Sequence, residues 1–191
     1  MIMTELEQYI ESNFDVPPSE VAALSTLFEQ ETLEKHSFYV KTGQPCGCLS
    51  FVRSGYLRVF KYYEGEDITQ WISSKGEFIA ELSGWIFGTP SRWNIQALTD
   101  CELYTISPSN YQRISTVVPQ WPALERRFIA KCFVSLEDRV FSFLSLSAEE
   151  RYLRLFEVDK ELINQIPLQY LASMLGMSAE TLSRIRRKLS S

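Results

Sequence analysis

The sequence is poor in the side chains that hold metals and form disulfides. Among 191 residues there is one histidine, His36, and there are four cysteines, Cys46, Cys48, Cys101 and Cys132. Four scattered cysteines are too few for a disulfide framework in a chain of this length. The C-x-C pair needs further ligands before it could hold a metal, so we expect no metal site. A single histidine also disfavours a small-barrel metalloenzyme, and no enzyme activity is expected.

Long apolar runs are missing as well. No stretch of about 18 apolar residues occurs, and the start, MIMTELEQYIESNF, lacks the basic and apolar regions of a signal peptide. No membrane contact is therefore expected, and the protein is predicted to be cytoplasmic. With 45% hydrophobic and 23% charged residues, the chain has enough apolar material for one sizeable domain and one small domain.

Positive charge is scarce overall but concentrated near one end. The net charge is −5, yet residues 163–191 carry four basic side chains and one acidic side chain, which leaves −8 on the rest. Such a basic patch is typical of a DNA-binding surface, because phosphate attraction acts within about a Debye length. The alternative is a solvated helix end whose cations complement the helix dipole.

Apolar periodicity and glycine spacing divide the chain into three parts. Residues 4–34 have helical periodicity, residues 36–108 form short β-type runs separated by glycines, and the remainder is helical. The run VRSGYLRVF is expected to be a hairpin turning at Ser54 and Gly55. The predicted fold is α+β: an antiparallel β-roll of double-stranded β-helix or jelly-roll type flanked by helices, a long helix and a C-terminal helix-turn-helix. The predicted domains are residues 1–108, a connecting and dimerisation segment at 109–146, and residues 147–191.

The helix predicted after Pro122 carries an apolar stripe with steps of three and four residues. We expect this stripe to form a homodimer seam, because an uncovered stripe would expose a large apolar patch. The alternative is that it packs only on the chain's own β region. The stripe consists of Ile129, Cys132, Phe133, Leu136, Val140 and Phe143.

The segment LQYLASMLGMSAETLSRIRR fits a helix-turn-helix. Ala172 is small where two helices must cross, and Gly176 follows four residues later, where the turn needs a positive φ. Pro167 is expected to start the first helix, and Ser178 to cap the second. The spacing of these residues makes the motif a strong prediction.

The second helix of this motif is expected to bind double-stranded DNA. In a major groove, arginine pairs with guanine and glutamate accepts from cytosine, whereas the terminal basic cluster is expected to contact phosphates. Glu180 and Arg184, four residues apart, could instead form a surface ion pair. The predicted DNA-binding residues are Ser178, Glu180, Thr181, Ser183, Arg184, Arg186, Arg187 and Lys188.

This layout resembles the Crp/Fnr family of bacterial transcription regulators, whose recognition helix reads R-E-T-V-x-R. The run AETLSR matches at Glu180, Thr181 and Arg184, with Ala179 in place of the first arginine. The resemblance covers nearly the whole chain. It implies a homodimer that reads a two-fold symmetric DNA site with residues 178–189, and it suggests RNA polymerase as a further partner. The sequence stops at Ser191, so the β-hairpin wing of the family is not expected.

The resemblance also implies a phosphate-binding cassette, in which a helix N-terminus and an arginine neutralise a cyclic phosphate and a glutamate holds the ribose. The sequence keeps this cassette only in part: Ala80 replaces its second glycine, and the arginine falls one position late, which can turn a side chain to the other face of a strand. We therefore expect no cyclic nucleotide and no resident cofactor, and either a different small-molecule effector or none. The expected effector-pocket residues are Gly76, Glu77, Glu81, Leu82, Ser91, Arg92 and Trp93.

Other functions remain as alternatives or are disfavoured. No Ser or Thr lies between Pro122 and Val134, where the family has base-binding hydroxyls, and no cysteine precedes Cys46, as an iron–sulfur cluster would require. Glu77 and Glu81 lack a nucleophile or metal partner for acid/base catalysis. The alternative function is a signalling or scaffolding module whose terminal helices bind protein rather than DNA.

Overall fold

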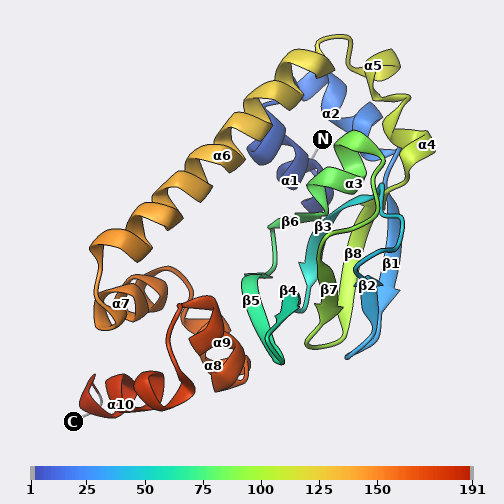
Figure 1. Ribbon diagram of the computed structural model, residues 1–191. Coiled ribbons are helices and arrows are strands. Elements are labelled where there is room, and N and C mark those ends of the chain that lie inside the picture. The colour runs from blue at the N-terminus through green and yellow to red at the C-terminus, as the bar shows by residue number, and fades with distance from the viewer. Residues whose placement is uncertain (1–2, 190–191) are drawn as a thin grey trace.

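The computed structural model describes residues 3–189, which form two β-sheets covered by helices, a long helix and a C-terminal helical region (Figure 1). This confirms the predicted fold class. No helix within the described residues is long and apolar enough to cross a membrane. The helices of the N-terminal part are α1 (Glu5–Phe14), α2 (Pro18–Ser25), α3 (Leu82–Phe87), α4 (Pro108–Tyr111) and α5 (Ile114–Val117).

The two sheets are four-stranded and antiparallel. One has the order β1-β8-β3-β6 and the other β2-β7-β4-β5. Alternate residues separate two cores: Val52 and Leu103 face the interior between the sheets, whereas Phe51 and Tyr104 pack against the helices. The strands are β1 (Glu29–Leu33), β2 (Phe38–Val40), β3 (Leu49–Ser54), β4 (Leu57–Tyr63), β5 (Glu66–Ser73), β6 (Phe78–Ala80), β7 (Asn94–Ala97) and β8 (Cys101–Ile106).

Two local predictions are wrong. Residues 29–33 form strand β1 rather than helix, because they pair with β8 along the sheet edge. The hairpin predicted at Ser54 and Gly55 does not form: β3 pairs with β6 and β8, and β4 pairs with β5 and β7. The chain passes from one sheet to the other at Gly55, whose φ is 89° and where a Cβ would lie 2.4 Å from the carbonyl oxygen of Asp100.

The long helix α6 (Trp121–Ser145) begins with a proline in its first turn, as expected. Its first half buries Trp121, Leu124 and Phe128 against α1 and the outer face of the sheet, where Phe14 contacts Trp121 and Phe128. Its second half projects away from the sheets toward the C-terminal region (Figure 1). One helix therefore both completes the core of the sheet domain and carries the terminal helices.

The C-terminal region is helical throughout. Ser147 and Glu150 form the capping box at its start, as the serine hydroxyl accepts from the Glu150 amide and the carboxylate accepts from the Ser147 amide. The apolar core of this region also includes Tyr56, Ile72 and Leu98 of the N-terminal part, so the two parts pack directly against each other. The helices are α7 (Ala148–Val158), α8 (Lys160–Gln165), α9 (Leu168–Met174) and α10 (Ala179–Leu189).

Candidate nucleic-acid interface and effector site

Helices α9 and α10 form a helix-turn-helix. Ala172 is 1% exposed at the crossing, and its carbonyl accepts from the Met177 amide at 3.0 Å. Gly176 has a φ of 65°, and a Cβ there would lie 2.7 Å from the ring of Phe143. Leu182 is fully buried on the inner face of α10. The local arrangement predicted for the turn is therefore present, except that α9 begins one residue after Pro167, which is its N-cap.

The outer face of α10 is polar and exposed. Ser178 caps the helix by accepting from the Thr181 amide at 3.2 Å, and Glu180, Ser183 and Arg184 are exposed. Thr181 is half-buried beside the Ser178 hydroxyl. The pKa of Glu180 is lowered, chiefly by a hydrogen bond from its own backbone amide and then by one from the Ser178 hydroxyl. The surface at the start of α10 thus offers a carboxylate, a hydroxyl and a guanidinium to solvent.

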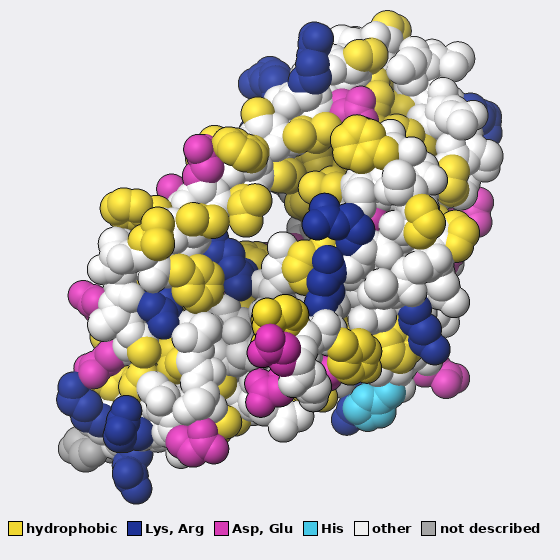
Figure 2. Space-filling view, viewed as in Figure 1, with side chains coloured by type: hydrophobic (Ala, Val, Ile, Leu, Met, Phe, Trp, Pro, Cys, Tyr) yellow, Lys and Arg dark blue, Asp and Glu magenta, His cyan; other side chains and the backbone are white. Residues whose placement is uncertain are grey.

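The end of α10 is the basic part of the surface. The last turn carries Arg186, Arg187 and Lys188, and Lys and Arg side chains gather there in the space-filling view (Figure 2). The Lys188 ammonium contacts the Glu149 carboxylate of α7 at 2.8 Å, which holds the end of α10 against α7. The expectation of a missing wing concerns chain beyond Leu189, outside the described residues.

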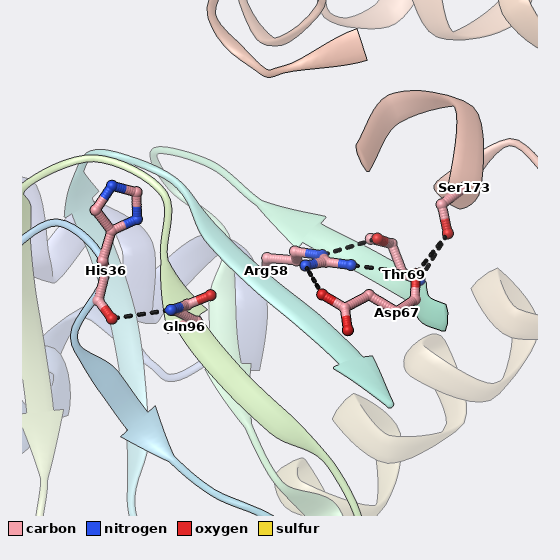
Figure 3. Close-up of polar contacts among 6 residues, drawn as sticks. All are labelled: His36, Arg58, Asp67, Thr69, Gln96 and Ser173. Atoms are coloured by element: carbon pink, nitrogen blue, oxygen red, sulfur yellow. Dashed lines mark hydrogen bonds and ion pairs between the residues drawn. The ribbon is translucent and has the colours of Figure 1, made fainter. Parts of the chain in front are cut away.

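The helix-turn-helix is docked on the sheets through β5 (Figure 3). The Thr69 amide donates to the Ser173 hydroxyl of α9 at 2.9 Å, and that hydroxyl donates to the Asp67 carbonyl at 3.3 Å. Because β5 is an edge strand, its outward amide would otherwise lack a ladder partner. Ser173 therefore fastens α9 to the open edge of the sheet.

A buried arginine supports this docking. Arg58 is 1% exposed, and its guanidinium stacks on Tyr170 of α9 at 4.0 Å and on Phe60 at 4.2 Å. Its Nε donates to Thr69 at 2.8 Å and its Nη1 to the Asp67 carboxylate at 3.1 Å. A buried charge needs such pairing to offset desolvation. The sequence offered no local signal for the contact with α9, because Tyr170 is more than 100 residues from Arg58.

The predicted cassette is closed by its own side chains. Glu81 is 4% exposed and caps α3: its carboxylate accepts from the Gly84 amide and from the Ser83 hydroxyl, each at 2.6 Å. Gly84 lies against the Cys46 carbonyl oxygen, which would be 2.1 Å from a Cβ at this position. The Gly84 amide at the start of α3 is therefore already bonded to Glu81, and the space beside Gly84 is filled by the Cys46 backbone.

The arginine position of the cassette is also closed. Ser91 is 3% exposed, and its hydroxyl donates to the Trp93 carbonyl at 2.7 Å. Its backbone pairs with residues 43 and 44, and Pro45 bridges Pro90. Arg92 is exposed, and Trp93 is half-buried with Lys61 over its ring.

Of the predicted effector residues, Glu77 alone lines either of the two cavities described for residues 3–189. Gly76 and Glu77 lie on the turn before β6, where the Glu77 carboxylate accepts from the Ser74 amide at 2.9 Å and lines a cavity beside α6. Burial raises the pKa of Glu77. Glu81 and Ser91 lie at the closed α3 site, and Leu82 is 42% exposed.

Open space inside the sheet domain lies elsewhere. A cavity of about 480 Å³ opens between β1, β2 and the loop that carries Cys46 and Cys48. Tyr39, Ser50, Thr105 and Glu31 form a hydrogen-bonded chain there, with oxygen–oxygen distances of 2.8 to 2.9 Å. Sequence reasoning missed this chain, which four different strands assemble. His36 lies on a nearby turn, where its carbonyl accepts from Gln96 (Figure 3), and residues 3–189 contain no group of three potential metal ligands.

The predicted dimer stripe divides into two groups. Ile129 and Cys132 are half-buried against the chain's own helical core, and Phe143 packs beneath the helix-turn-helix at Gly176. The stripe residues left exposed are Phe133 (59%), Leu136 (47%), Val140 (51%) and, in part, Phe143 (39%). Three apolar residues outside the predicted stripe are exposed on the same half of α6: Val134 (54%), Phe141 (67%) and Leu144 (81%).

A two-sheet domain joined by a long helix to a helix-turn-helix defines the architecture of this chain. Known proteins share this fold. CLP, a c-di-GMP responsive global regulator of Xanthomonas campestris, aligns with a TM-score of 0.68 and 18% identity over 91% of this chain and 92% of its own. FixK2 of Bradyrhizobium japonicum aligns with a TM-score of 0.69 and 19% identity over 85% and 84%. The catabolite activator protein of Thermus thermophilus aligns with a TM-score of 0.57 and 22% identity over 91% and 84%.

A sequence comparison matches part of the sheet domain to a known family model. Residues 30–116 are similar to the cyclic nucleotide-binding domain. No curated protein sequence matches the chain. The structural neighbours are Crp/Fnr-type regulators, so the fold that the sequence suggested is confirmed.

Proposed function

We propose that this protein is a transcription regulator of Crp/Fnr type that binds a two-fold symmetric DNA site as a homodimer and does not respond to cyclic AMP. The observation that carries the proposal is α10. It follows a helix-turn-helix turn, exposes Glu180, Ser183 and Arg184 on one face and ends in a basic turn. This order suits base contacts by the first turns and phosphate contacts by the last.

Dimerisation is supported by the exposed half of α6. Phe133, Leu136, Val140 and Leu144 follow steps of three and four, and each is at least 47% exposed. A stripe of this length is costly in water, and a second α6 offers the same stripe for coiled-coil packing. A two-fold dimer would place two copies of α10 about 34 Å apart, the repeat of one DNA turn.

The proposed insensitivity to cyclic AMP is supported by the closed cassette. The Glu81 carboxylate accepts the hydrogen bond of the Gly84 amide at the start of α3. Ser91 lies at the position where a cationic group would be needed to neutralise the phosphate. A cyclic nucleotide would have to displace the buried Glu81 carboxylate and the Cys46 loop. Both are fixed by hydrogen bonds or backbone contacts.

The test is selection of DNA from genomic fragments, followed by fluorescence anisotropy at fixed salt with Arg184→Ala. We expect a two-fold symmetric site, one homodimer per site by native mass spectrometry, and no change on adding cyclic AMP. Arg184→Ala should weaken the selected site by about 1–3 kcal/mol and relax its sequence preference. Arg113→Ala, at an exposed arginine between α4 and α5, is the matched control and should bind like the wild type.

Equal affinity for every duplex after selection would refute sequence-specific regulation and favour the scaffolding alternative. Tightened DNA binding with cyclic AMP would refute the proposed insensitivity. A monomer on a single half-site would refute the dimer.

A further inference from the structure

A second cavity, of about 370 Å³, lies where the sheets, α6 and the helix-turn-helix region meet. The molecule is hollowed between α6 and the sheets, and Lys, Arg and apolar side chains border the opening (Figure 2). The sheets contribute Trp71 and Ile72, α6 contributes Arg139 and Phe143, and the terminal region adds further apolar and charged residues. A cavity of this size and mixed lining is typical of a small-molecule site.

Three arginines line this cavity, and they differ in how many of their donors are used. Arg151 uses all three of its nitrogens: its Nε, Nη1 and Nη2 donate to the carbonyls of residues 175, 146 and 176. Arg139 makes one hydrogen bond, from Nη2 to the Met174 carbonyl, and stacks near Trp71 and Phe143. Arg154 has no hydrogen-bond or ion-pair partner within residues 3–189. Since a guanidinium has five N–H donors, Arg139 and Arg154 retain the most donors for a ligand.

The carboxylates of the same cavity are largely occupied. Asp159 accepts from the Leu162 amide at 2.8 Å and from the Ser74 hydroxyl at 3.4 Å. Glu77 accepts from the Ser74 amide. Asp138 is exposed on α6. No ion pair joins any of these carboxylates to the cavity arginines among the described residues, so Arg139 and Arg154 are not neutralised by them.

We propose that this interdomain cavity binds an anionic amphipathic small molecule: one carboxylate, sulfonate or phosphate held by Arg139 and Arg154, and an apolar or aromatic body against Trp71 and Phe143. Bidentate arginine contacts suit such anions, and the aromatic walls suit the apolar body. The proposal rests on the proposed function in one respect, that the occupant acts as effector. A ligand that contacts the sheets, α6 and α7 together stabilises the docking of the helix-turn-helix on β5.

The cavity stays accessible in the proposed dimer. An α-helix advances 100° per residue, so Ser135, Asp138 and Ser142 on the cavity side lie opposite the exposed stripe of Phe133 and Val140. A second copy packed on the stripe would therefore leave the cavity open. Occupancy of the cavity and dimerisation can be measured separately.

The experiment compares two fluorescent probes that share one scaffold. 8-Anilinonaphthalene-1-sulfonate carries an anion, and N-phenyl-1-naphthylamine is the same scaffold without it. We expect the full-length protein to bind one sulfonate probe per chain, and Arg154→Gln to weaken that binding on the order of tenfold, as loss of a charged hydrogen bond would. Binding of the neutral probe should change less than twofold, roughly within experimental error. Arg113→Gln, at an exposed arginine between α4 and α5 that does not line the cavity, is the matched control, and near-UV circular dichroism checks that each variant is folded.

A second variant tests the location. Ser142→Trp fills the cavity from α6 and should abolish binding of both probes while leaving the dimer intact. Unchanged sulfonate affinity in Arg154→Gln, or unchanged binding of both probes in Ser142→Trp, would overturn the proposal. Probe binding needs no DNA, so its failure is distinct from failure of the proposed regulator function.

Discussion

The α3 cassette and the helix-turn-helix each contain a glycine pressed against a remote part of the chain, yet the two sites have opposite outcomes. At Gly84 the neighbour is the backbone carbonyl of Cys46, so the cassette is sealed by main chain. At Gly176 the neighbour is the ring of Phe143, and the glycine lies on the turn behind α10 rather than on its outer face. One close contact closes a ligand site, whereas the other supports a surface that stays open.

The difference shows where this chain keeps and where it loses its resemblance to cyclic-nucleotide regulators. A helix-turn-helix depends on short-range packing, which the residues from Leu171 to Ile185 supply. A nucleotide pocket depends on empty space and on an uncommitted cation. In this protein neither is present at the cassette: the Glu81 carboxylate takes up the space beside α3, and Ser91, which is uncharged, donates to the Trp93 carbonyl.

Of the substitutions that test this comparison, Gly84→Ala is expected to change the free energy of unfolding most. The new methyl group would overlap the Cys46 carbonyl, and backbone on both sides must move, so the free energy of unfolding should fall by about 3 kcal/mol. Urea denaturation followed by circular dichroism measures the loss. A change below about 0.5 kcal/mol, within the range of ordinary surface substitutions, would mean that the cassette is not rigidly closed.

A smaller effect is expected from Gly176→Ala. Its φ of 65° disfavours a side chain by about 1–2 kcal/mol, but the Phe143 ring can rotate away, unlike a carbonyl. The same urea assay should therefore rank Gly176→Ala as milder than Gly84→Ala. The reverse order would contradict the distinction between a backbone wall and a side-chain wall.

The smallest effect is expected from Glu77→Gln, and it concerns pH. Burial raises the pKa of Glu77 above its ordinary value of 4.5, so the folded state holds the proton more tightly than the unfolded state. Glu77 therefore costs stability as pH rises from about 4.5 through the raised pKa. Glutamine does not titrate and can still accept from the Ser74 amide. The free energy of unfolding of the variant should therefore rise relative to that of the wild type as pH increases through this window. Parallel stability curves for the two proteins from pH 4 to 7, roughly spanning this window, would show that Glu77 is not desolvated.

Sequence reasoning was strongest where the structure is local. Ala172, Gly176 and Ser178 lie within seven positions of one another, and their small size, positive φ and capping hydroxyl follow from residue type. The capping box of α7 is predicted for the same reason. Sheet membership was not predicted in this way: β3 and β4 are neighbours in sequence but pair with different partners, so the expected hairpin is wrong.

The sequence by itself determined the architecture, the helix-turn-helix and the broken pattern of the cassette, because periodicity, capping and residue identity act over a few positions. Only the tertiary structure decided that Cys46 fills the α3 site and that Arg58 and Ser173 hold α9 on β5. It also decided that Arg139 and Arg154 face one cavity. These contacts join residues tens of positions apart, and their geometry depends on how the sheets, α6 and the terminal helices pack together.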